Sequence, residues 1–163
     1  MGAPYNTQRK WDSYFQAAIA GAMTPTSIPQ LKTNGDKIAE AAKAYLGTPY
    51  VWNGKETSAG GLDCSGLVYQ ALNRAGINVG IQRARDYYWS KNFGTPVDKN
   101  NLQPGDIVFF GSNGTATHTG IYVGNGNMIH SSGGSTNTAS NPGKGVEYKR
   151  VDSRADFLGA KRF

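Results

Sequence analysis

The chain has 163 residues, a single cysteine, 22 glycines and a formal net charge of +6. That length suits one domain with a hydrophobic core and is too short for two domains of ordinary size. One cysteine cannot form an intramolecular disulfide or a cluster of thiolate metal ligands, and no apolar stretch approaches the roughly 20 residues of a membrane-spanning helix.

The positive charge predicts attraction to polyanions, such as nucleic acid, anionic lipid or another acidic polymer. Basic residues are scattered along the chain, without a dense tract or a helix that carries a basic stripe. This distribution argues against a nucleic-acid-binding surface. No export signal is visible at the N-terminus, and we leave open that the chain is a fragment of a longer protein with further domains.

Residues 1–33 are predicted to form an appendage of one helix and a linker. Apolar residues recur at helical spacing between Trp11 and Ile19. Pro25 and Pro29 then favour an extended connector, because proline interrupts a helix. The main domain is therefore expected over residues 34–163.

Two helices are predicted at the start of that domain. Residues 36–46 are rich in helix formers, begin with Asp36 and meet Gly47 at their end. A second helix opens at Asp63. After Gly76 an irregular region is expected, which ends at a turn formed by Pro104 and the glycine that follows it.

Strands are predicted over the second half of the chain, at residues 107–110, 119–123, 127–131 and 146–151. Between residues 131 and 145 lies a polar stretch of Gly, Ser, Thr and Asn, which indicates a mobile surface loop that could border a functional site. Helices followed by strands indicate the α+β class.

Cys64 falls in the first turn of the second predicted helix, with Asp63 as its N-cap. The positive end of the helix dipole favours the thiolate, which is the nucleophilic form of cysteine. An unperturbed thiol is only about 3% ionised at pH 7, so full ionisation raises its reactive fraction roughly thirtyfold. That gain is small for amide hydrolysis, and a positioned acid and donors for an oxyanion are needed as well.

The two histidines, His118 and His130, both lie in one predicted hairpin. With a three-residue loop at 124–126, Gly120 faces His130, and both histidines project from one face as diagonal neighbours. In that register His130 can orient the ring of His118, as the third member of a catalytic triad orients its base. A two-residue turn at Asn125 and Gly126 would put them on opposite faces. Spacing leaves both registers open, and two unrelated histidines remain the simpler explanation without Cys64.

Other chemistry finds little support in the sequence. Two histidines and one cysteine could supply three zinc ligands, but the closely spaced ligand pairs of zinc sites are missing, and we expect no metal. No serine lies in a G-x-S-x-G motif, and no glycine-rich run has the spacing of a phosphate loop. The site suits a reactive cysteine, and no metal or other cofactor is expected.

Four blocks of the sequence together resemble the NlpC-type cell-wall cysteine peptidases, which are papain-like hydrolases of peptidoglycan stem peptides. The blocks are residues 47–54, 62–68, 103–110 and 118–130, in the order of that family, and the resemblance extends over roughly residues 36–163. It implies a papain-like α+β fold in which N-terminal helices pack against a central antiparallel β-sheet.

The resemblance also implies roles for individual residues. Cys64 would be the nucleophile, His118 the base and later the acid, and His130 the residue that orients His118. Tyr50 matches a tyrosine beside the nucleophile, where its hydroxyl could position the substrate or the oxyanion. The backbone N–H of Cys64 would donate to that oxyanion.

Four further residues are candidates for substrate binding. Asp63 and Ser65 flank the nucleophile, and the resemblance assigns them to binding of the free amine of the stem peptide. Arg83 could pair with a substrate carboxylate, as could Arg85. Each has a simpler explanation: Asp63 as a helix cap, and the arginines as solvated surface. The segment 83–89 matches the family only loosely, and Thr119 replaces a commoner small aliphatic residue.

The resemblance therefore predicts hydrolysis of the bond between D-γ-glutamyl and the following diamino acid of a peptidoglycan stem, through a thioester. It implies action outside the cell or at the cell wall, with stem peptides and anionic wall polymers as partners. Two alternatives use the same residues differently. One is a Cys/His amidase or acyltransferase on another acyl group, and the other is a wall-binding module without catalysis.

Overall fold

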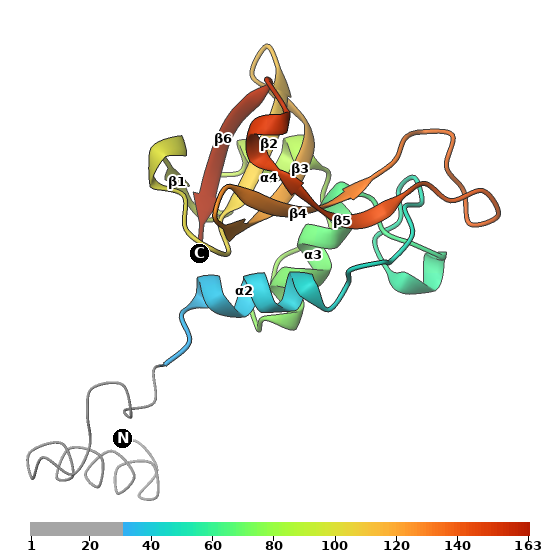
Figure 1. The fold of residues 1–163 in the computed structure, drawn as a ribbon, viewed down its shortest axis with the longest axis horizontal. Helices are drawn as coiled ribbons and strands as arrows, with labels where there is room; N and C mark the ends of the chain where they lie inside the picture. The colour runs from blue at the N-terminus through green and yellow to red at the C-terminus, as the bar shows by residue number, and fades with distance from the viewer. Residues whose placement is uncertain (1–30) are drawn as a thin grey trace, which may run out of the picture. The chain divides into compact units, whose positions relative to one another are not determined.

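The computed structural model describes residues 31–163, of which Lys32–Phe163 form one compact unit. The helix predicted between Trp11 and Ile19 lies outside the described residues. Within them, helices pack against one antiparallel sheet, which confirms the predicted α+β class (Figure 1). No helix of residues 31–163 is long and apolar enough to cross a membrane.

The first described helix, α2, spans Asn34–Lys43 and begins two residues before the predicted start. Its N-cap is Thr33, whose hydroxyl accepts the backbone N–H of Asp36 while the Asp36 carboxylate accepts the N–H of Thr33. Asp36 is thus the fourth residue of a capping box rather than the cap itself. The helix buries Ile38 and Ala42 completely.

Helix α3 spans Cys64–Arg74 and has Asp63 as its N-cap, as the sequence predicted. The Asp63 side chain accepts the backbone N–H of Gly66 at 2.7 Å. The face that α3 buries is the predicted one: Leu67, Val68, Ala71 and Leu72. In Figure 1, α2 and α3 lie side by side below the sheet, and α3 also packs on strands of the sheet.

Six strands form the sheet in the order β1-β6-β2-β3-β4-β5, and every neighbouring pair is antiparallel. Their bounds are β1 Thr95–Val97, β2 Ile107–Ser112, β3 Thr115–Gly124, β4 Asn127–Ser132, β5 Gly145–Arg150 and β6 Phe157–Arg162. Three short 3-10 helices also occur between residues 31 and 163, at Thr57–Ala59, Lys99–Asn101 and Val151–Ser153. The four predicted strands correspond to β2 to β5.

One α-helix and two strands were not predicted. The region treated as irregular after Gly76 contains the six-residue helix α4, Ala84–Trp89, and the short edge strand β1. The C-terminal strand β6 was missed as well, and it inserts between β1 and β2. Lys161 of β6 is buried, and its ammonium donates to the carbonyls of Tyr87 and Ser90 at the end of α4. A buried lysine in a strand weakens the alternating pattern on which strand prediction rests.

The core lies on both faces of the sheet, because alternate residues of the central strands point in opposite directions. One face packs against the helices and contributes Ile107, Phe109, Ile121 and Ile129 to the larger cluster. The other face forms a smaller cluster with Val108, Phe110, Met128 and Ala160. The sheet is thereby fixed on both sides, which gives the functional side chains on β3 and β4 a rigid support.

The hairpin of β3 and β4 combines features of both predicted registers. Asn125 and Gly126 both have positive φ and form a two-residue turn that pairs Gly124 with Asn127. A bulge between Tyr122 and Gly124 adds one residue, so that Ile121 pairs with Ile129. This is the pairing of the three-residue alternative, and it puts both histidines on one face.

Candidate active site

Cys64 occupies the first turn of α3, where the backbone of the preceding segment comes very close to the helix. The N–H of Asp63 donates to the carbonyl of Gly54 at 2.8 Å. A Cβ added to Gly66 would lie 2.1 Å from that same carbonyl oxygen. The close contact between the Gly54 carbonyl and α3 therefore requires glycine at position 66. This contact fixes the position of the helix turn that carries the Cys64 thiol.

The nucleophile segment is also tied to the sheet. The Ser131 hydroxyl on β4 donates to the carbonyl of Leu62 at 2.6 Å, two residues before Cys64. Thr119 on β3 is fully buried, and its hydroxyl donates to the carbonyl of Val108 at 2.8 Å, which explains why a polar residue is tolerated there. Strands β3 and β4 are thereby held beside the start of α3.

The two histidines are in direct contact. Nε2 of His118 lies 2.8 Å from Nδ1 of His130, and the ring planes are 89° apart. A Cβ on Gly120 would lie 3.2 Å from the Cβ of His130 and 3.0 Å from the sulfur of Met128. Glycine at position 120 therefore leaves the space that the histidine pair needs.

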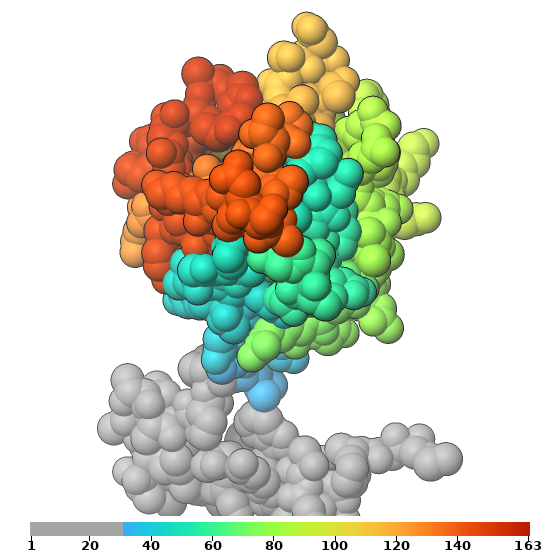
Figure 2. All heavy atoms as spheres, turned by 90° about the vertical axis from the view of Figure 1, so that its right-hand side faces the viewer, coloured from blue at the N-terminus to red at the C-terminus, as the bar shows by residue number. Residues whose placement is uncertain are grey.

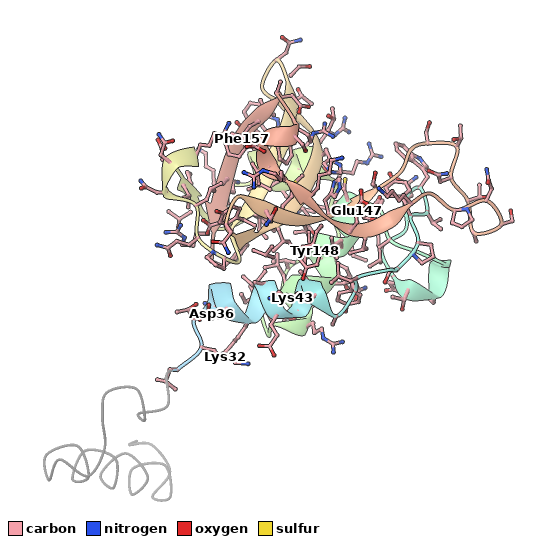
Figure 3. The ribbon with its side chains drawn as sticks, in the orientation of Figure 1. Lys32, Asp36, Lys43, Glu147, Tyr148 and Phe157 are labelled. Carbon is pink, nitrogen blue, oxygen red and sulfur yellow. The ribbon has the colours of Figure 1, made fainter. Side chains whose placement is uncertain are left out.

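A carboxylate extends this pair. Glu147 lies on β5 (Figure 3). Its Oε1 lies 3.3 Å from Nε2 of His130, and its other oxygen is 2.6 Å from the Lys144 ammonium. An ionised carboxylate only accepts, so a neutral His130 carries its proton on Nε2 and accepts at Nδ1. Nε2 of His118 is then the donor to His130. This assignment leaves the lone pair of His118 on Nδ1.

Tyr50 is buried beside the same turn of α3. Its backbone pairs with Gly143 in both directions, at 3.3 and 2.9 Å, and Gly133 packs so closely that an added Cβ would meet the Tyr50 ring at 2.2 Å. Burial raises the pKa of the Tyr50 hydroxyl, and the neighbouring Cys64 and Asp63 raise it further. The hydroxyl is therefore neutral and able to donate.

The loop of residues 133–144 packs against the segment that carries Tyr50. The N–H of Trp52 donates to the carbonyl of Asn137 at 3.0 Å, in addition to the pairing of Tyr50 with Gly143. Figure 2 shows this loop, in orange, lying against the blue-green segment around residue 50. The polar stretch predicted as a surface loop thus supports one wall of the candidate site.

Asp63 and Ser65 already have a cationic partner within the chain. The ammonium of Lys55 lies 2.8 and 2.6 Å from the two carboxylate oxygens of Asp63 and 2.5 Å from the Ser65 hydroxyl. Lys55 was not singled out in the sequence, because nothing in its eight-residue separation from Asp63 signals the contact. The structure places it directly beside the predicted nucleophile turn.

A cleft of about 430 Å³ opens at this point. Five of the predicted site residues line it: Tyr50, Asp63, Cys64, Ser65 and Arg83. Lys55 and Arg85 line it too, together with Trp52, whose side chain is half exposed rather than part of the core. Residues 115–117, which lead into His118, line the cleft as well.

The ionisation of Cys64 differs from the expectation based on its helix position. Burial, and to a smaller extent the Asp63 carboxylate, raises the pKa of the Cys64 thiol to about 11. The backbone N–H groups of Thr119 and Ser65 and the ammonium of Lys55 oppose it without reversing it. The resting residue is thus a neutral thiol, because desolvation outweighs the helix dipole here.

The histidines are also neutral at rest. Burial, together with the nearby His130 and Arg154, lowers the pKa of His118 to about 3. Burial lowers the pKa of His130 as well, although Glu147 opposes this. Partial burial works against ionisation of Glu147, but Lys144 and His130 hold its pKa below the usual value.

Not every predicted contact is made directly. Among the hydrogen bonds of residues 31–163, none joins the Cys64 thiol to a histidine ring, and the hydrogen bond of His118 goes to His130. Catalytic hydrogen bonds commonly tighten only when substrate is bound. Within the same residues, no three His, Cys, Asp or Glu side chains converge as ligands for a metal ion.

The fold and this set of residues are those that the sequence led us to expect of a papain-like domain. Residues 47–154 match the model of the NlpC/P60 family, and the chain belongs to that family. The sequence resemblance to NlpC-type peptidases is thereby confirmed.

Relatives of this chain include enzymes named for two different bonds. The chain is 39% identical over 133 residues to the gamma-D-glutamyl-L-lysine dipeptidyl-peptidase of Bacillus cereus (strain ATCC 10987 / NRS 248), a match that covers 77% of this chain and 36% of the relative. It is 40% identical over 131 residues to the murein DD-endopeptidase MepH of Escherichia coli (strain K12), covering 77% and 48%.

The fold agrees with a solved structure. The crystal structure of an NlpC/P60 family protein from Bacillus cereus ATCC 10987 matches with a TM-score of 0.65 and 30% identity, covering 83% of this chain and 41% of that one. The chain spans less than half the length of each of these three relatives.

Proposed function

We propose that this domain hydrolyses peptidoglycan stem peptides at the bond between D-γ-glutamyl and the following diamino acid. The observation that carries the proposal is Cys64 in a cleft at the start of α3, beside Tyr50 and next to the strands that hold the histidine pair. The printed name of the Bacillus cereus relative specifies a γ-D-glutamyl bond to L-lysine, which supports this choice of bond.

The reaction begins with attack by Cys64 on the scissile carbonyl carbon. Because thiol and imidazole are both neutral at rest, the proton leaves Sγ as the new S–C bond forms, and Nδ1 of His118 accepts it. His118 is thus a general base during attack rather than half of a preformed ion pair. His130 and Glu147 hold its ring in the tautomer that leaves Nδ1 free.

The carbonyl oxygen becomes an oxyanion in the tetrahedral intermediate. The backbone N–H of Cys64 lies in the first turn of α3, where backbone N–H groups have no partner inside the helix. It and the neutral Tyr50 hydroxyl are the proposed donors to the oxyanion. Each such donor lowers the activation free energy by about 3 kcal/mol when it is positioned in advance.

The intermediate collapses when His118 returns its proton to the leaving nitrogen. The C–N bond breaks, the diamino acid portion departs with a free amine, and the D-γ-glutamyl portion remains as a thioester on Sγ. A water molecule then gives its proton to Nδ1 of His118 and attacks the thioester. Transfer of that proton to Sγ restores the thiol and releases the carboxylate.

Digestion of purified peptidoglycan tests the proposal. Wild type and Cys64→Ala are incubated with the same preparation, and soluble products are identified by mass spectrometry. Fragments that end at D-γ-glutamate, seen with the wild type alone, would support both the bond and the nucleophile. Fragments that end elsewhere would favour a different bond, such as the one in the printed name of the Escherichia coli relative.

Two other functions use the same site. A Cys/His amidase or acyltransferase would act on another acyl group, and product masses distinguish it. A wall-binding module would retain wall binding in both variants and release nothing. The histidine pair and its carboxylate argue for catalysis, because binding alone does not require a base held in one tautomer.

The proposed substrate places the protein outside the cell or at the cell wall. The net charge of +6 is compatible with attraction to anionic wall polymers as well as to stem peptides. Sedimentation with purified walls at low and high salt measures this contribution, because exposed charges are screened by salt.

A further inference from the structure

Lys55 is a cation built into the wall of the cleft. Its ammonium contacts both oxygens of Asp63 and the Ser65 hydroxyl, and the side chains of Lys55 and Asp63 are only 16% and 9% exposed. The Lys55 carbonyl is held in turn by the side-chain amide of Gln70 at 2.8 Å. The ammonium is therefore a fixed part of the site rather than a mobile surface charge.

The Asp63 carboxylate is largely occupied by donors within the chain. One oxygen accepts from the N–H of Gly66 at 2.7 Å, from Lys55 at 2.8 Å and from the Ser65 hydroxyl at 3.2 Å. The other accepts from Lys55 at 2.6 Å. A carboxylate offers about four acceptor positions, two on each oxygen, so Oδ1 is fully used and one position remains on Oδ2. A substrate ammonium could reach that position only beside the Lys55 ammonium, against the repulsion of two like charges.

The remaining charge of the cleft also disfavours a substrate cation. The charged residues that line it are three basic ones, Lys55, Arg83 and Arg85, and one acidic one, Asp63. Arg85 lies 3.7 Å from Asp86 in a half-exposed pair, which compensates its charge weakly. The cleft thus favours carboxylates and repels a second ammonium near Cys64.

We propose that Lys55 makes this site select stem peptides whose N-terminal amine is acylated, as in peptides still attached to the glycan, over peptides with a free N-terminus. Lys55 is then a specificity-determining residue, and it replaces the substrate amine that the sequence assigned to Asp63 and Ser65. This inference rests on the proposed function, because it concerns the stem peptide that the cleft receives.

The test compares two synthetic stem peptides that differ only at the N-terminus, one with a free amine and one acetylated. The wild type should show a kcat/KM at least about tenfold higher for the acetylated peptide, because like charges forced together in an interface are strongly unfavourable. Lys55→Met should shift that ratio toward the free amine by about tenfold or more. Lys32→Met removes a lysine that pairs with Glu40 outside the cleft and should leave the ratio unchanged.

Two further measurements distinguish a change in specificity from misfolding of the variant and from cleavage at a bond other than the proposed one. Thermal melting and circular dichroism show whether Lys55→Met is folded, and Lys55→Gln replaces it if it is not. Calorimetric titration of both peptides into Cys64→Ala reads the same preference without turnover. Tighter binding of the acetylated peptide there would support the inference even if cleavage occurred at another bond.

The outcomes are distinct. A wild type that prefers the free amine, or a folded Lys55 variant with an unchanged ratio, overturns the role of Lys55 and leaves the proposed function standing. Absence of cleavage of either peptide by the wild type, with no difference in binding, overturns the proposed function and the inference with it.

Discussion

Oε1 of Glu147 lies 3.3 Å from Nε2 of His130, on the side of the ring opposite to the one that contacts His118. The Lys144 ammonium holds the other carboxylate oxygen at 2.6 Å. Glu147 is therefore the end of a chain of hydrogen bonds that fixes which nitrogen of His118 is free. We regard it as a positioning residue, since it acts through His130 and does not reach the substrate cleft.

Replacing Glu147 by alanine should lower kcat roughly tenfold with little change in KM, because outer partners that orient a catalytic side chain typically have effects of this size. Glu147→Gln should retain most of the activity, since its amide oxygen still accepts from His130. Steady-state kinetics on a stem peptide measure both. Glu40→Ala, at an exposed site on α2, is the matched control. Equal losses in the alanine and glutamine variants would contradict the positioning role.

The neutral state of Cys64 leads to a prediction for its reactivity. With the pKa of the thiol raised to about 11, the rate of alkylation by iodoacetamide should rise with pH, with a slope near one in log units, up to about pH 11. A preformed thiolate–imidazolium pair would instead give a plateau from acid to neutral pH. Mass spectrometry of the intact protein follows the reaction, since Cys64 is the one cysteine in the sequence.

A control separates ionisation from access. Alkylation of urea-unfolded protein should follow the ordinary thiol pKa of about 8.5. The folded and unfolded curves should therefore be displaced along the pH axis. Coincident curves, or a folded protein that reacts fully at pH 6, would contradict the raised pKa.

Much of the site can be predicted from the sequence where local rules apply. The N-cap at Asp63 and the buried face of α3 depend on residues within one or two turns, and both were predicted correctly. The hairpin register was left open because it depends on a bulge at Tyr122 to Gly124 as well as on the turn type. Turn chemistry alone does not specify such a bulge.

The residues that were missed are those whose roles come from distant contacts. Lys55 meets Asp63 only because the close approach of Gly54 and Gly66 brings their segments together. Glu147 meets His130 because β5 pairs with β4, where the two residues are register partners. Their sequence positions carry no periodic or motif signal, so pattern reasoning gave no reason to select them.

The lowered pKa of His118 predicts a loss of stability in acid. Its pKa is about 3 in the folded protein and about 6.5 in an unfolded chain, so the unfolded state binds more protons between these values. The free energy of unfolding should therefore be highest above about pH 6.5 and fall as the pH drops toward 3. Urea denaturation at pH 7.0 and pH 4.5 measures the change.

His118→Gln isolates this contribution from that of the carboxylates. Asp152 and Asp156 have lowered pKa values through their pairing with Arg150 and Arg154. Their contributions to the free energy of unfolding are therefore also lost in acid. The variant keeps these groups and removes one histidine, so its free energy of unfolding should fall less between pH 7.0 and pH 4.5 than that of the wild type. An equal loss would show that His118 titrates normally in the folded protein.

The close approach at Gly66 gives a prediction for stability and activity together. An alanine there would place its Cβ 2.1 Å from the carbonyl oxygen of Gly54 and 3.0 Å from Oδ1 of Asp63. The backbone must move to relieve this contact, which should cost roughly 3 kcal/mol of stability and displace Cys64. Gly134→Ala is the matched control, because nothing lies within 4 Å of its added Cβ.

Thermal and urea denaturation of the two alanine variants, followed by assay of the folded fraction, checks this prediction. Gly134→Ala should unfold within about 0.5 kcal/mol of the wild type, as surface substitutions usually do, and keep its activity. Gly66→Ala should lose both stability and turnover, since the carbonyl of Gly54 also accepts the N–H of Asp63, the residue before the nucleophile. A Gly66 variant as stable and active as the control would mean that the turn of α3 does not depend on this contact.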